Sequence, residues 1–188
     1  MSIMEIIKVP NPFLKITAKL VVDVNKNILT ILDDMLETMY HANGIGLAAT
    51  QISIDKRLIV MDCGKNNFDP KDISEEEYNE KIKSKKLEPF PIKMINPEII
   101  SFGKNIEERE EGCLSIPGYN ANVKRPSSLK VSYIDENKKN VTLEAYGLLA
   151  TCIQHEIDHL NGILFIDHIS KLKREIILKK AIKEYEKN

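Results

Sequence analysis

The pattern His155-Glu156-x-x-His159, within QHEIDHLNG (154–162), constrains this chain more than any other feature of its sequence. On an α-helix, residues four apart share a face and lie about 6 Å apart along the axis, so both imidazoles can reach one ion. The glutamate between them can hold or move a proton at a metal-activated water. The pattern therefore predicts a metal-binding helix within residues 147–162.

A catalytic metal site also needs a third protein ligand and an open position for water. In one metalloprotease pattern a third histidine follows, but that position holds Phe165, which cannot bind a metal. In another pattern the third ligand is a downstream glutamate, and the local candidates are Glu175 and Glu184 in a Lys-rich segment. These observations weaken the hypothesis of a zinc endopeptidase but leave it open.

The three cysteines differ as candidate ligands. Cys152 lies about 10.5 Å from His159 along a helix axis, too far for one ion with bonds of about 2.0–2.3 Å to accept both together with His155. We expect Cys152 to line the wall of the site as a small buried hydrophobe, and Cys63 to pack in the core. Cys113, in the extended or irregular segment EEGCLSIPG, could meet the helix from another element, but an ordinary buried cysteine is an equal alternative.

The whole chain has the composition of an ordinary globular protein. Its 188 residues suit one domain over residues 1–188, with residues 64–90 as a charged surface insertion. The net charge of −1 gives no reason to expect nucleic-acid binding. We expect no membrane span, because no apolar run reaches 18 residues, and cytoplasmic localisation, because three cysteines occur without a secretory signal.

Helices and strands do not alternate strictly along the sequence, which favours the α+β class. We expect antiparallel or mixed sheets around the central metal-binding helix, with an N-terminal helix and a C-terminal amphipathic helix. The elements expected from apolar periodicity and turn residues are a helix at 27–42, a buried strand at 57–63, strands between 91 and 111 broken by Pro97 and Gly103, a hairpin over 128–147, and a helix at 170–188.

The stretch GIGLAATQ (44–51) superficially fits a dinucleotide-binding fingerprint. That fingerprint needs a strand before it and a helix after it, whereas here the predicted helix comes first. The alternative is a glycine-permitted close approach of the backbone to a ligand, ending in Gln51. A glutamine amide is a neutral donor suited to a developing oxyanion.

In this order, GIGLAATQ, EGCLS and QHEIDHLNG resemble the three motifs of the peptide deformylase family, and the likeness extends from PNPFL to the last helix. The resemblance implies a metal held by Cys113, His155 and His159, with water as the fourth ligand. The ion would be Fe(II), which nickel, cobalt or zinc can replace. The implied reaction removes the formyl group from N-formyl-methionyl ends of newly made polypeptides and releases formate.

The resemblance also implies roles for individual residues. Glu156 would move the proton, while the Gln51 amide and the backbone N–H of Leu114 would stabilise the oxyanion. The implied substrate-binding residues are Gly44, Ile45, Gly46, Leu148 and Cys152.

Some features depart from the family pattern or leave alternatives open. Asn120 stands where some relatives have an arginine near the bound peptide. Glu111 and Arg125 could pair to brace the cysteine segment, but we expect a solvated charge at each. Segment 170–188 has seven basic and three acidic residues; it could contact the ribosome, although a solvated face is favoured. A structural metal site or a ribosome-binding module is the non-enzymatic alternative.

Overall fold

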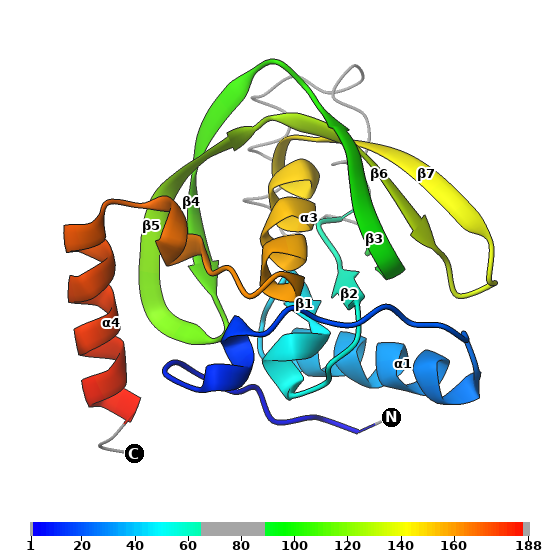
Figure 1. The fold of residues 1–188 in the computed structure, drawn as a ribbon, viewed down its shortest axis with the longest axis horizontal. Helices are drawn as coiled ribbons and strands as arrows, with labels where there is room; N and C mark the ends of the chain where they lie inside the picture. The colour runs from blue at the N-terminus through cyan, green and yellow to red at the C-terminus, as the bar shows by residue number, and fades with distance from the viewer. Residues whose placement is uncertain (1, 65–88, 186–188) are drawn as a thin grey trace.

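The computed structural model describes residues 2–64 and 89–185. It contains a five-stranded antiparallel sheet in the order β1-β2-β3-β6-β7 and a separate antiparallel pair, β4-β5, with α3 between them (Figure 1). The predicted α+β class with sheets around a central helix is therefore confirmed. The principal elements are α1 (Lys26–His41), β1 (Gly46–Ala48), β2 (Leu58–Met61), β3 (Ile92–Phe102), β4 (Ile106–Cys113), β5 (Ile116–Pro126), β6 (Ser128–Ile134), β7 (Asn140–Tyr146), α3 (Gly147–Leu160) and α4 (Lys171–Tyr185), with short 3-10 turns η1 (Pro12–Lys15), η2 (Ala49–Ile52) and η4 (Phe165–His168).

Strand β2 is buried at all four of its positions. Side chains alternate between the two faces of a strand, and here both faces are covered. Leu58 and Val60 belong to the apolar cluster that includes α1, whereas Ile59 and Met61 belong to the cluster that includes α3. The uninterrupted run LIVM is required because a strand sandwiched between two helices has no solvated face.

The predicted break of the strand at Pro97 is wrong, because β3 continues through the proline. The pairing of β3 with β6 shifts register between Ile95 and Glu98, and Asn96 adopts a φ of 52°. The Asn96 amide accepts from Val21 N–H at 2.8 Å and donates to Val21 O at 2.9 Å. A bulge at this point accommodates the missing donor of proline without ending the strand.

Two hairpins flank α3. The predicted hairpin is confirmed as β6 and β7, which pair from Ser128↔Tyr146 to Ile134↔Asn140. The second, β4-β5, closes at Cys113↔Ile116, so Cys113 lies at its tip. Strand β5 was not predicted, because IPGYNANVKRP is poor in residues that favour strands.

The C-terminal helix α4 packs outside β5, away from the central helix (Figure 1). Among its described side chains only Ala181 is buried, so its apolar side makes limited contact with the rest of the chain. The predicted charged insertion falls almost wholly on residues 65–88, which lie outside the described part. Within the described residues, none of the helices is long and apolar enough to cross a membrane.

Candidate metal centre and active site

Three side chains from distant parts of the sequence converge beside α3. His155 and His159 lie one turn apart on the helix, and their Nε2 atoms are 3.2 Å apart. Cys113, at the tip of the β4-β5 hairpin, places its Sγ 3.2 Å from His159 Nε2. The candidate ligand atoms of all three residues lie within 4.8 Å of one another.

These distances fit a single ion. Metal–nitrogen bonds of about 2.0 Å and metal–sulfur bonds of about 2.3 Å in tetrahedral geometry separate the ligand atoms by about 3.3–3.5 Å. The measured 3.2 Å separations are within a few tenths of an ångström of those values. One thiolate and two imidazoles form a donor set suited to iron, nickel, cobalt or zinc. The residues present therefore fit the group that the sequence motifs imply.

A buried carboxylate orients one of the histidines. Glu111 Oε2 lies 2.9 Å from His155 Nδ1, which directs the other ring nitrogen, Nε2, toward Cys113 and His159. Arg125 donates to both Glu111 oxygens, at 2.6 and 3.0 Å, and also to Asp158 at 2.8 Å. The expectation that Glu111 and Arg125 are solvated charges is wrong, because each is only 5% exposed.

The pKa of Glu111 reflects this pairing. Burial alone would raise it, but the hydrogen bonds from His155 and Arg125 hold the pKa of Glu111 below its ordinary value. Glu111 therefore stays ionised and can accept hydrogen bonds from both partners. A carboxylate in contact with a histidine ligand raises the basicity of that ligand and fixes its tautomer.

Glu156 has a different environment from Glu111. It is 4% exposed, and its Oε2 atom has no hydrogen-bond partner among the described residues. Burial raises the pKa of Glu156 to about 7. Gly46 allows this packing, since an added Cβ would lie 2.8 Å from Cys152 Sγ and closer still to Glu156 Oε1. The approach of β1 to α3 therefore requires glycine at this position.

The Gln51 side chain is held with its amide group toward the cysteine. Its Oε1 accepts from the backbone N–H of Ala48 at 2.8 Å. Its Nε2 then lies 3.2 Å from Ser115 Oγ and 3.5 Å from Cys113 Sγ. Gln51 is therefore a fixed donor beside the three candidate ligands, and the motif GIGLAATQ places it there through η2.

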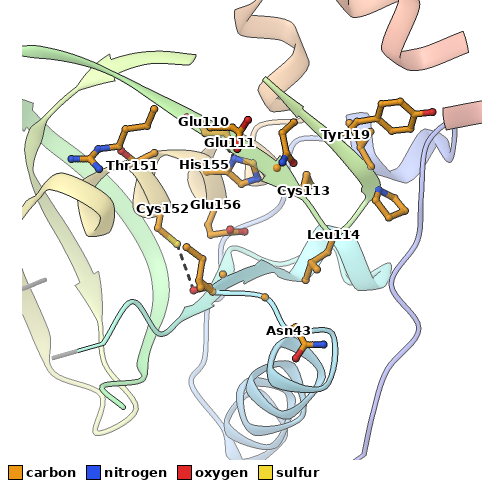
Figure 2. Close-up of a pocket in the computed structure, with 18 of the residues that line it drawn as sticks. Asn43, Glu110, Glu111, Cys113, Leu114, Tyr119, Thr151, Cys152, His155 and Glu156 are labelled. Carbon is orange, nitrogen blue, oxygen red and sulfur yellow. Dashed lines mark hydrogen bonds and ion pairs between the residues drawn. The ribbon is translucent and has the colours of Figure 1, made fainter. Parts of the chain in front are cut away.

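A cavity of about 410 Å³ opens onto this group. Figure 2 shows Cys152 and Glu156 facing it from α3, with Cys113, Leu114 and Tyr119 on the opposite side. All predicted site residues line the cavity except His159, which is 1% exposed and lies behind the other ligands. The lining predicted from the sequence comprises Gly44, Ile45, Gly46, Gln51, Cys113, Leu114, Leu148, Cys152, His155 and Glu156.

Sequence reasoning missed other residues of the cavity. Asn43, Arg109, Glu110, Tyr119 and Thr151 also line it. Thr151 could have been found, because it lies four residues before His155 and so shares its helix face. Arg109 could have been found by extending the alternation of strand β4 back from Cys113, but only once β4 was known to lie beside the helix.

The structure also tests the alternative third ligands. Phe165 is 1% exposed, and its ring stacks on His155 with centroids 6.3 Å apart, so it packs against the site. Glu175 is largely exposed and pairs with Lys171, while Glu184 accepts from Tyr119. Neither glutamate belongs to the group of candidate ligands found among the described residues. The ligand arrangement of a zinc endopeptidase is therefore not present there.

The family model of polypeptide deformylase matches residues 3–175 of this chain. The chain belongs to the polypeptide deformylase family. This family consists of metal-dependent hydrolases, which confirms the predicted class of enzyme, and Cys113, His155 and His159 form a group that could hold the metal.

Individual relatives agree with the family model over almost the entire length. Peptide deformylase of Agrobacterium fabrum is 49% identical over 183 residues, covering 97% of this chain and 96% of the relative. The crystal structure of peptide deformylase from Ehrlichia chaffeensis has a TM-score of 0.85 at 36% identity, covering 99% of this chain and 98% of that one. A second structure of the Ehrlichia enzyme, in complex with actinonin, has a TM-score of 0.83 at 38% identity, with 98% of each chain covered.

Replacing Glu111 by Gln should weaken metal binding by about 10- to 100-fold, because the His155 ring loses its carboxylate partner. Competition of the purified protein with a chromogenic chelator measures this affinity. Glu108→Gln is the matched control, since Glu108 is an exposed residue of the same strand and pairs with Lys124. Equal affinity in the Glu111 and Glu108 variants would show that the buried carboxylate does not support the metal site.

Proposed function

We propose that this protein removes the formyl group from the N-formyl-methionyl ends of newly made polypeptides, using Cys113, His155 and His159 as the metal ligands. The observation that carries the proposal is the convergence of one thiol and two imidazoles beside the buried carboxylate of Glu156, whose Oε2 atom has no hydrogen-bond partner among the described residues. Membership of the polypeptide deformylase family supports the choice of reaction. We further infer that residues 1–188 form one catalytic domain.

Cys113, His155 and His159 would hold the ion, which when bound would supply a Lewis acid for activating water and polarising the formyl group. We propose that Fe(II) is the physiological ion and that nickel, cobalt and zinc can replace it. The mixed thiolate and imidazole donors support this range of metals, since such ligands bind several first-row ions. Glu111 supports the same role by orienting His155.

Glu156 carries the proton in this proposal. Its Oε2 atom is buried beside His155, and no other described group donates to it. It can therefore accept a proton from the attacking water and later deliver it to the amine that leaves the formyl carbon. Gly46 keeps this carboxylate in place, because any side chain there would collide with it.

Two donors of the chain itself would stabilise the negative charge that develops on the formyl oxygen. The Gln51 amide is fixed by Ala48 and lies beside Cys113. The backbone N–H of Leu114 follows Cys113 directly, at the tip of the hairpin and on the cavity wall. Such preorganised donors act on the transition state more than on the substrate, and removing one typically costs about 10²–10³ in turnover.

The substrate would bind in an extended conformation along β1. This strand is the edge of the five-stranded sheet, so one side of its backbone is not paired within the sheet. Gly44, Ile45 and Gly46 line the cavity at that edge, and the Gly46 backbone can form main-chain hydrogen bonds with a peptide. Leu148 and Cys152 on α3 would then surround the methionine side chain, which needs an apolar pocket.

Glu156→Gln should lower formate release from formyl-Met-Ala-Ser by about 10²–10⁴ and leave metal content unchanged, because Glu156 moves a proton but does not bind the ion. Metal analysis and a formate assay on the same preparation measure both. Glu175→Gln is the control, because Glu175 is a solvent-facing residue of α4. Near-normal turnover of the Glu156 variant would refute its role.

We also propose that the protein acts in the cytoplasm and that α4 contacts the ribosome. The described part of α4 (Lys171–Tyr185) holds six basic and two acidic residues, and most of its side chains are exposed. Such a surface can attract the phosphates of ribosomal RNA.

The triple replacement of Lys179, Lys180 and Lys183 by Glu should abolish cosedimentation with ribosomes at low salt and leave formate release from a short peptide unchanged. Increasing salt should weaken binding of the unmodified protein, since the attraction is electrostatic. Lys124→Glu, on β5, is the control for added negative charge. Equal cosedimentation of the triple variant and the control would refute the ribosome contact.

A further inference from the structure

The site cavity contains a single Arg or Lys among the described residues that line it, Arg109, and the proposed reaction does not use it. Its position follows from the way β4 and α3 lie beside each other. Cys113 and Glu111 point to the same face of β4 and contact His159 and His155, respectively. Two residues of a strand advance about 6.7 Å and four residues of a helix about 6 Å. Every second residue of β4 therefore lies beside every fourth residue of α3.

Arg109 is the next residue of this row, two positions before Glu111. Its Nη2 atom reaches the first turn of α3, where it lies 3.6 Å from the position that a Cβ on Gly147 would take. Leu148 and Thr151 from the same turns of α3 also line the cavity, and Figure 2 shows Thr151 beyond Cys152 on the side away from Cys113. This part of the cavity wall therefore combines the apolar Leu148 with two polar side chains, Thr151 and Arg109.

The length of a methionine side chain can be compared with the distance along α3 from His155 to Leu148. From His155 back to Leu148 the helix rises about 10.5 Å. An extended methionine spans about 8 Å from its formyl carbon to its terminal methyl group, from standard bond lengths. The sulfur atom would therefore lie near Cys152 and Thr151, just before the guanidinium. An acceptor attached to that sulfur would point to a group that can donate to it.

Arg109 has N–H groups that its hydrogen bonds with Glu107 do not use and that could donate to such an acceptor. Its Nε and Nη2 atoms donate to one oxygen of Glu107, at 3.2 and 2.7 Å. A guanidinium carries five N–H donors in all. The pair with Glu107 is partly exposed on both sides, so it contributes little energy and competes weakly with a second acceptor.

We propose, building on the proposed function, that Arg109 is a specificity-determining residue that lets this site accept peptides beginning with N-formyl-methionine sulfoxide. The sulfoxide has the length of methionine and adds one polar oxygen to the sulfur. A wholly apolar pocket would reject it by about tenfold or more, since the buried oxygen would have no donor. Arg109 supplies that donor at the end of the pocket.

The test compares kcat/KM for formyl-Met-Ala-Ser, its methionine sulfoxide counterpart and formyl-norleucine-Ala-Ser. The unmodified protein should hydrolyse the sulfoxide peptide within about tenfold of the methionine peptide. Arg109→Leu should widen that gap by a further tenfold or more and leave the ratio of norleucine to methionine little changed. Arg109→Lys should give an intermediate gap, because it keeps a cation with a different donor geometry.

Lys124→Gln serves as the control, because Lys124 is an exposed cation on β5 outside the cavity. An identical sulfoxide-to-methionine ratio in the unmodified protein and in Arg109→Leu would overturn the proposal. Rejection of the sulfoxide by more than about 100-fold in the unmodified protein would also overturn it. Failure to release formate from formyl-Met-Ala-Ser would instead refute the proposed function, so the two failures are distinguishable.

Discussion

The buried carboxylate of Glu111 connects the three elements on which the site depends. It belongs to β4, accepts two hydrogen bonds from Arg125 on β5, and contacts His155 on α3. A buried charge that loses a partner is destabilised by about 3–5 kcal/mol. Sliding the hairpin relative to the helix would break these bonds together. Glu111 therefore fixes the hairpin against the helix, and with it the position of Cys113 at the hairpin tip.

Hydrogen-bond pairing also distinguishes the two buried glutamates of the candidate site, Glu111 and Glu156. Glu111 is paired on both oxygens, so burial does not prevent its ionisation. Glu156 is equally buried but has an oxygen without a partner among the described residues. A paired carboxylate suits a structural role, and an unpaired one suits proton transfer. The helix supplies the histidines, and the two glutamates differ because of what surrounds them.

The sequence was informative wherever local periodicity governs structure. Helical spacing predicted α1, α3 and α4, and the run RLIVMDC predicted a buried strand. The motif order led to the correct family, which the whole-chain comparisons confirmed. Each of these inferences depends on residues that are close in sequence or on a known pattern, and none requires knowledge of which elements lie side by side.

What could not be predicted depends on contacts between distant segments. The burial of Glu111 and Arg125 arises only when β4, β5 and α3 meet. Strand β5 has weak intrinsic preference and is formed by pairing with β4, and the bulge after Asn96 depends on the Val21 backbone. Arg109 enters the cavity for the same reason, since its side chain direction follows from the register of β4 beside the helix.

We expect one thiolate and two imidazoles to hold the metal and to leave a position open for solvent. X-ray absorption at the metal edge of protein purified without oxygen tests it directly. The expected spectrum has an iron edge with one sulfur and two imidazole nitrogens as protein ligands, and it loses the sulfur signal in Cys113→Ser. Four protein ligands, or a spectrum without sulfur, would contradict it.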